Sequence, residues 1–246
     1  MGRFVILSGP SCVGKGPLYT ALKLFFPEYA KTMNKLVLYN SRAARPGEID
    51  GLDYHFRPRE EIENLRNKQN FIVMNVRSDV QAIHLDALEK ILKTGNAFFE
   101  GNPFVGKELL GIARSKKIPC TNAFLSPLSK DEILYLKQVE PKVNLPDFIT
   151  DVMRRKLLRR TRKQKTLLSL KDLENIETRA SSAYKEMKEA FRFDCVIPNH
   201  DGEDSENWSA FYYPVGDARL VLLSFVELLK VNQPKRAEQW EEHLLP

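Results

Sequence analysis

An apolar run that leads directly into a glycine loop is the feature that most limits how this chain can fold. Phe4 to Leu7 is typical of a buried strand, and Gly9-Pro10-Ser11-Cys12-Val13-Gly14-Lys15 follows it. Apolar residues then recur at helical spacing from Leu18 to Phe26. A strand, a glycine loop and a helix in this order direct backbone N–H groups and a positive helix end at one point, which favours a bound phosphate. The alternative is a plain turn with an exposed Lys15.

The loop matches the first seven positions of the nucleotide-binding pattern G-x-x-x-x-G-K-[ST]. We expect Lys15 to be catalytic, because its ammonium can reach the β and γ phosphates of ATP. The residues predicted to surround the ATP phosphates are Gly9, Ser11, Cys12, Val13, Gly14, Lys15, Gly16 and Pro17. The eighth position is Gly16 instead of a hydroxyl residue. Mg²⁺ would therefore depend on water, the nucleotide phosphates, and Glu100 or Thr20.

Strands alternate with helices along the rest of the chain, which predicts an α/β fold. Strands are expected at 35–39, 71–76, 97–100, 123–125 and 194–197, and helices at 60–67, 84–93, 130–139, 170–190 and 217–229. The fold class that follows is a parallel sheet of the P-loop NTPase type with helices on both faces, plus inserts.

Composition narrows the class of protein further. The 246 residues are 43% hydrophobic, enough for a large core, and the net charge of +6 favours a polyanionic partner such as a nucleotide. The three cysteines are widely spaced, which fits a reducing compartment, and the four histidines lack metal-binding spacing. No apolar run is long enough for a membrane span, and no charged segment leads into a signal sequence. We expect a cytoplasmic protein with no membrane contact.

The segment Ser41 to Phe56 carries two arginines three residues apart, with a tyrosine close by. Arg42, Arg45 and Tyr54 could bracket a dianionic phosphate through charge-assisted hydrogen bonds. The alternative is a solvated basic turn. The segment resembles the acceptor segment of guanylate kinases, whose pattern is roughly R-x-x-R-x-G-E-x-x-G-x-D-Y-x-F, and every fixed position is present.

Two later stretches resemble the same family. These are Ile176 to Met187, similar to I-x-x-R-L-x-x-A-x-x-E-M, and Phe193 to Asn199, similar to F-D-Y-V-I-V-N. The resemblance implies that Arg179 stabilises the transferring phosphoryl group and that Asn199 lies near the adenine of ATP. It also implies a weak Mg²⁺ contact at Glu100. The acceptor-binding set would be Arg42, Arg45, Glu48, Tyr54 and Asn102, and the catalytic set Lys15, Arg179 and Arg45.

The chain departs from the family where guanine is read. Val73 follows Phe71-Ile72 where the family has a glutamate, and Leu38 stands where a serine is usual. The stretch Ser78 to Ile83 lacks the tyrosine and hydroxyl of the family's G-x-Y-Y-G-[ST]. Such hydrogen-bond readers discriminate strongly between substrates, so their loss implies a relaxed or changed acceptor. Asp79, Asn75 and Asp86 could each supply a substitute, although an ordinary polar surface residue is the favoured interpretation of each.

A strongly basic run, Arg154 to Lys165, has three interpretations: a lid over the phosphates, a solvated helix face, or a contact with nucleic acid, in that order. The lid candidates are Arg159, Arg160 and Arg162. We predict one domain over 1–246, with core segments 1–37, 84–137 and 170–230, an acceptor-binding insert 38–83, a lid insert 138–169 and a tail 231–246.

The leading functional prediction is ATP-dependent phosphoryl transfer to a nucleoside monophosphate, first GMP or dGMP, with Mg²⁺ and small nucleotides as partners. One alternative is a kinase of another phosphorylated acceptor, such as a modified nucleotide or a sugar phosphate. The other is a non-catalytic guanylate-kinase-like module that binds a phosphopeptide. Nucleic acid is disfavoured as a partner, and the oligomeric state stays open.

Overall fold

The computed structural model describes residues 2–45, 47–139, 142–231 and 234–245. Pro46 of the predicted acceptor segment, residues 140 and 141 of the predicted lid insert, and residues 232, 233 and 246 of the predicted tail lie outside the described residues. Within the described ranges, no helix combines the length and apolar character needed to span a bilayer.

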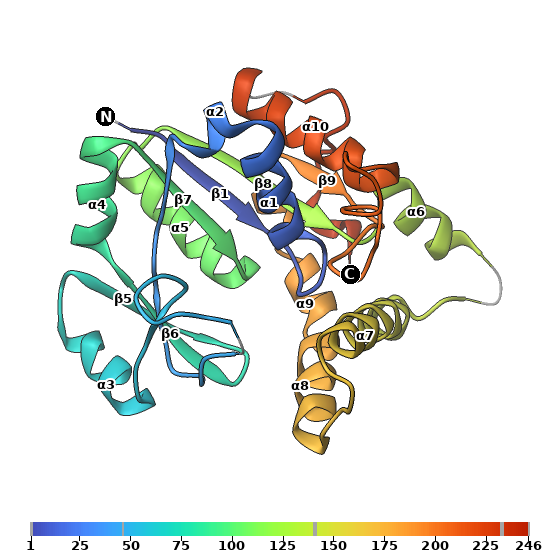
Figure 1. Cartoon of the computed structure of the whole chain (residues 1–246), viewed down its shortest axis with the longest axis horizontal. Coiled ribbons are helices and arrows are strands. Elements are labelled where there is room, and N and C mark those ends of the chain that lie inside the picture. Colours follow the sequence, from blue (N-terminus) through green and yellow to red (C-terminus); the bar gives the residue numbers. More distant parts are fainter. Residues whose placement is uncertain (1, 46, 140–141, 232–233, 246) are drawn as a thin grey trace.

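A parallel sheet forms the centre of the molecule (Figure 1). Its five strands run in the order β2 (Met33–Lys35), β7 (Asn96–Gly101), β1 (Phe4–Ser8), β8 (Cys120–Ser126) and β9 (Val196–Pro198). Alternate residues of β1 enter two different cores, with Phe4 and Ile6 in one and Val5 and Leu7 in the other. A central strand that is apolar on both sides needs a covering layer on each face.

Helices provide both layers. The Val5 face is covered by α1 (Lys15–Phe25), α2 (Pro27–Ala30) and α10 (Gly216–Val231). The Phe4 face is covered by α4 (Leu85–Thr94), α5 (Pro103–Ser115), α6 (Lys130–Gln138) and α9 (Ala183–Met187). This arrangement confirms the predicted parallel sheet with helices on both faces.

A second, smaller sheet lies within residues 38–83 (Figure 1). Its strand order is β4 (His55–Phe56), β3 (Tyr39–Asn40), β6 (Asp79–His84) and β5 (Phe71–Val76). The helix α3 (Arg59–Asn64), which continues as the 3-10 turn η1 (Leu65–Asn67), packs on one side through Ile62, Val80 and Ala82. The opposite side packs against the main core through Leu38, Val76 and Ile83. The second sheet is therefore an extension of the molecule's core.

A helical hairpin follows α6 in the chain. It consists of α7 (Leu145–Gln164), which contains the basic run, and α8 (Leu170–Ser181). In Figure 1 this hairpin and the second sheet lie on the same side of the central sheet. Its apolar residues Ile149, Met153 and Ile176 join the main core.

The C-terminal residues also belong to the core. The main chain of Glu238 forms an antiparallel bridge to Val196 of β9, and the short turn η3 (Glu242–Leu244) follows. Trp240, Leu244 and Leu245 are buried in the main core. This segment therefore covers the outer edge of the central sheet.

The structure corrects four expectations about secondary structure. The strand expected at 35–39 is divided, because Leu36 N bonds to Phe98 of the central sheet while Leu38 O bonds to His55 of the second. Strand β6 and helix α5 were not expected. The helix expected at 170–190 bends at Ser182, whose hydroxyl bonds back to Arg179 O at 3.0 Å, and a 3-10 turn η2 (Ala190–Arg192) closes it.

Candidate active site

The glycine loop joins the end of β1 to the start of α1. Gly9 and Gly14 have φ values of 150° and 103°, a region that side chains rarely adopt. A Cβ at Gly14 would also lie 2.5 Å from Asn199 Nδ2. Glycine is therefore required at Gly14 both by the backbone turn and by the close approach of Asn199.

Lys15 lies inside this loop and is 7% exposed. Its Nζ donates to Gly9 O at 2.9 Å and to Pro10 O at 2.8 Å. Burial lowers the pKa of Lys15, while the carboxylates of Glu203 and Glu100 oppose that shift. The ammonium is thus held within the loop by weak neutral acceptors, which an anion could replace.

Glu100, at the end of β7, stands beside Gly16. A Cβ added at Gly16 would lie 3.8 Å from Glu100 Oε1, so a hydroxyl residue there would meet this carboxylate. Burial raises the pKa of Glu100 and Lys15 lowers it. The described residues contain no group of three or more histidines, cysteines or carboxylates able to hold a metal ion. Mg²⁺ needs only one or two carboxylates when water and nucleotide phosphates fill its other positions, so Glu100 fits as a single protein contact.

In the predicted acceptor segment, Arg42 forms an ion pair with Glu48. Its Nη1 and Nη2 each donate to Glu48 at 2.6 Å, and its guanidinium lies 5.2 Å from the ring centre of Tyr54. Glu48 also accepts a 2.7 Å bond from Arg45 N. Glu48 therefore orders the segment and largely neutralises Arg42.

Arg45 differs from Arg42 because its guanidinium makes no hydrogen bond or ion pair within the described part of the chain. The side chain is half-buried. Burial and the charge of Arg42 lower the pKa of Arg45, and Arg160 contributes as well. Arg45 thus brings an uncompensated positive charge to the site.

Arg179 approaches the loop from the end of α8. Its Nε donates to Ser11 Oγ at 3.0 Å, and the side chain is 7% exposed. Burial, followed by the charges of Arg160 and Arg45, lowers the pKa of Arg179 to about 9. Arginines from three separate segments therefore converge beside the glycine loop.

Only one of the three lid candidates faces the loop. Arg160 forms a 2.5 Å ion pair with Glu203, whose backbone N–H donates to Cys12 O at 3.2 Å. Arg159 is 61% exposed and pairs with Asp204 at 2.8 Å. Arg162 is exposed and forms no ion pair among the residues that the structure describes.

Most of the basic run is neutralised within the chain. The pairs are Arg154 with Glu177, Arg155 with Asp151, Lys156 and Arg159 with Asp204, Arg160 with Glu203, Lys163 with Glu206, and Lys165 with Asp172. Four of these seven pairs attach α7 to the loop between His200 and Glu206. The helix is fastened to the loop that borders the phosphate site.

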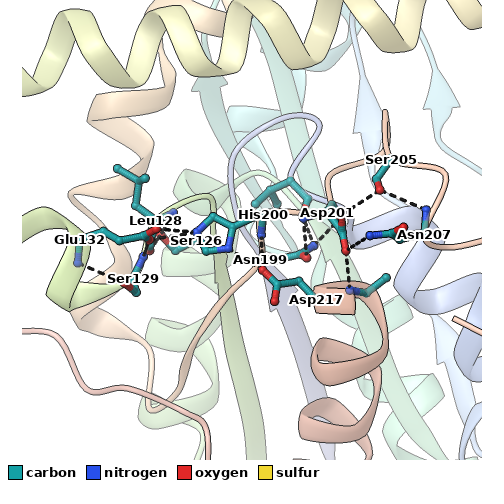
Figure 2. Close-up of polar contacts among 12 residues, drawn as sticks. Ser126, Leu128, Ser129, Glu132, Asn199, His200, Asp201, Ser205, Asn207 and Asp217 are labelled. Carbon is teal, nitrogen blue, oxygen red and sulfur yellow. Dashed lines mark hydrogen bonds and ion pairs between the residues drawn. The ribbon is translucent and has the colours of Figure 1, made fainter. Parts of the chain in front are cut away.

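Asn199 is fully buried behind the glycine loop. Its Nδ2 donates to Val13 O at 2.7 Å and to Asp201 O at 2.9 Å, and its Oδ1 accepts from Asp201 N. Figure 2 shows the next contacts along this loop, between His200 and Asp217 and from Asp201 to Ser205 and Asn207. Asn199 thus braces the loop, and its predicted contact with adenine stays a prediction.

Arg77 and Glu203 are the two residues described at the site that carried no recognisable sequence signal. Arg77, at the turn between β5 and β6, contacts both Ser11 and the buried Glu186. The predicted acceptor residue Asn102 donates to Glu186 Oε1 at 2.8 Å and caps α5 by accepting from Phe104 N. The Asn102-Pro103 pair is a helix-start signal that could have revealed α5.

Comparison with known proteins finds guanylate kinases. The family model for guanylate kinase matches residues 1–99. The guanylate kinase of Streptococcus pneumoniae is 45% identical over 64 residues, which are 26% of this chain and 29% of that protein. That of Bacillus cereus is 32% identical over 135 residues, 54% of this chain and 62% of that protein. The matched region thus spans less than two thirds of these relatives.

A solved structure resembles the chain over a greater length. The guanylate kinase from Anaplasma phagocytophilum superposes with a TM-score of 0.54 and 19% identity, covering 96% of this chain and 89% of the other. Residues 1–99 thus resemble guanylate kinases in sequence, and the chain shares the fold of a solved guanylate kinase.

Proposed function

We propose that this protein transfers the γ-phosphoryl group of ATP to a nucleoside monophosphate, with GMP or dGMP as the first acceptors to test. The observation that carries the proposal is the convergence of Arg45, Arg160 and Arg179 beside the glycine loop. Glu203 balances the charge of Arg160, but three like charges that are partly desolvated and close together still favour a further anion among them. Phosphoryl groups are such anions.

Each group then has a distinct task. Lys15 and Arg179 stabilise the charge that develops on the transferring group, and Arg45 holds the acceptor phosphate. Arg42, ordered by Glu48, and Tyr54 shape the acceptor side. No covalent intermediate is needed, because positioning and electrostatics are sufficient. Mg²⁺, when bound, neutralises charge on the nucleotide phosphates, and Glu100 is its candidate protein contact.

The base of the acceptor is the part that most needs measurement. Leu38 and Ile83 are buried in the main core, and Val73 packs on the α3 side. These positions therefore offer no hydrogen bond to a guanine ring.

The free thiols of Cys12, Cys120 and Cys195 agree with the predicted cytoplasmic location.

The test is transfer from ATP to a panel of phosphorylated acceptors by the wild type, Lys15→Met and Arg45→Ala. We expect GMP or dGMP to rank first and each variant to lose transfer at least about 100-fold, with thermal unfolding little changed. Arg66→Ala, which removes an exposed arginine of the same insert, is the control with unchanged transfer. Wild-type rates in Lys15→Met or Arg45→Ala would contradict the assigned roles. Failure of ATP with Mg²⁺ to bind the wild type would contradict the proposed activity.

A further inference from the structure

The turn between β5 and β6 reaches from the second sheet across to the phosphate loop. Arg77 lies at this turn, and its Nη2 donates to Ser11 Oγ at 3.0 Å. Its Nε donates to Ser182 Oγ at 2.9 Å and to Glu186 Oε1 at 2.7 Å. One guanidinium thereby joins the acceptor-side sheet, the glycine loop and the junction of α8 with α9.

The partner of Arg77 is a fully buried carboxylate. Glu186 is 0% exposed, and its ion pair with Arg77 has an N–O distance of 2.6 Å. Among the described residues, this is the ion pair that compensates the Glu186 charge. Asn102 binds the same oxygen, while Glu186 Oε2 has no hydrogen-bond partner within the described residues. Loss of Arg77 would leave a buried charge uncompensated, which is strongly unfavourable.

The backbone at Arg77 is itself held in an unusual conformation. Its φ is 58°, in the left-handed region that residues with a Cβ seldom adopt. Such a conformation persists only where surrounding contacts hold it. The two-residue turn that joins β5 to β6, closed by the Val76–Asp79 pair, holds this conformation, and from it the Arg77 side chain reaches the glycine loop.

We propose that Arg77 is a positioning residue, which fastens the β4–β3–β6–β5 sheet to the glycine loop and sets the distance between acceptor and donor. The catalytic part of this proposal rests on the proposed function. Arg45 and Tyr54 belong to the segment beside that sheet, while Lys15 and Ser11 belong to the loop. A small misplacement of one reacting group relative to the other is enough to slow transfer strongly.

The experiment compares Arg77→Met and Arg77→Lys with a matched control, Arg59→Met. Arg59 belongs to the same insert and donates to Ser78 O at 3.0 Å, but it is exposed and does not cross to the loop. We expect Arg77→Met to lower kcat about 10- to 100-fold, while the Kd for ATP changes less than about two-fold. Arg77→Lys should recover part of kcat, because a single ammonium can pair with Glu186 but cannot reproduce the arginine fork. Arg59→Met should match the wild type.

Amide hydrogen exchange of the β5 and β6 strands gives a readout that does not depend on activity. Exchange should be faster in Arg77→Met than in Arg59→Met. If Arg77→Met does not fold, Arg77→Lys takes its place, and we expect the same changes in kcat and in exchange rate to be smaller. Unchanged kcat in a folded Arg77→Met would overturn the positioning role, and equal exchange rates would overturn the fastening. An inactive wild type that still shows the exchange difference would refute the proposed function and leave the fastening supported.

Discussion

At position 16 the nucleotide-binding pattern calls for a hydroxyl side chain, and the space for it is present. A Cβ there would make an ordinary contact with Glu100 and no clash. The backbone at Gly16 does not lie in the left-handed region. Nothing in the local geometry therefore requires glycine, in contrast to Gly9 and Gly14.

We expect Gly16→Ser to fold and to need less Mg²⁺ for half-maximal transfer, because a hydroxyl beside Glu100 adds a metal contact or orders a metal-bound water. It should also raise the free energy of unfolding by about 0.5 kcal/mol, since glycine is a poor helix residue. Thermal unfolding and a Mg²⁺ titration of activity measure the two effects.

Gly111→Ser is the matched control, because Gly111 lies within α5 with open space around it. It should gain similar stability with no change in Mg²⁺ dependence. An unchanged Mg²⁺ requirement in Gly16→Ser would contradict a metal position at this point.

The sequence predicts that some residues lie at the site, and it does not reveal others. Lys15 belongs to a motif whose loop geometry is fixed by nearby glycines, so its burial inside the loop follows from the sequence. Arg77 and Glu203 belong to no motif, and they reach the loop only because β5–β6 and the segment after β9 fold over it. Their roles depend on long-range packing, which local patterns do not encode.

At the scale of elements, the segment from His200 to Glu206 is held by contacts on both sides. It bonds to the glycine loop through Cys12 O and to α7 through ion pairs with Glu203 and Asp204. His200 lies between Glu132 Oε1 at 2.9 Å and Asp217 Oδ2 at 2.5 Å. Burial opposes protonation of His200, but the bonds to Glu132 and Asp217 outweigh it and raise its pKa.

A raised pKa predicts a pH-dependent stability. Protonated His200 stabilises the fold fully below its ordinary pKa of 6.5, and this contribution fades as the pH rises through the raised folded-state value. The difference in unfolding free energy between the wild type and His200→Gln should therefore be largest in mildly acidic solution and shrink toward alkaline pH. Denaturant unfolding from pH 5.5 to 9 measures it.

His243→Gln, at an exposed position, is the control for the loss of any histidine. A His200 difference that stays flat over the pH range would show that the two carboxylates do not act on a protonated ring.

Most elements with strong local patterns were predicted, with α5 as an exception, and the segment shared between two sheets was not. The apolar run of β1 and the amphipathic α4 follow directly from periodicity. The strand expected at 35–39 fails because its hydrogen bonds go to two different sheets, which the pattern of one segment cannot show. Strand β6 does alternate polar and apolar residues from Asp79 to Ala82, which is a strand signal that the prediction did not use.

At the scale of the whole molecule, net charge gives a misleading impression of the basic helix. The chain carries +6, yet six basic side chains on α7, and Lys165 directly after it, are paired with carboxylates of the same chain. The same molecule buries Leu244 and Leu245 together with Phe4, so its main core joins residues that are far apart in the sequence.

We expect Trp240→Ala to lower the free energy of unfolding by about 3 kcal/mol. Trp240 is 7% exposed at the edge of the sheet, so the loss of its ring leaves a cavity in the core. Tyr212→Ala removes an aromatic ring that is 92% exposed and should leave stability unchanged. Denaturant unfolding of both variants checks this, and equal midpoints would show that the C-terminal segment does not contribute to the core.

The position of β1 has a consequence for how the protein is made. This strand is translated before its two neighbours, β7 and β8, which are complete only after Gly101 and Ser126. The bridge from Val196 to Glu238 follows more than a hundred residues later. The nascent chain therefore carries an apolar β1 that stays unpaired until β7 has been translated, which makes it a natural binding segment for a chaperone.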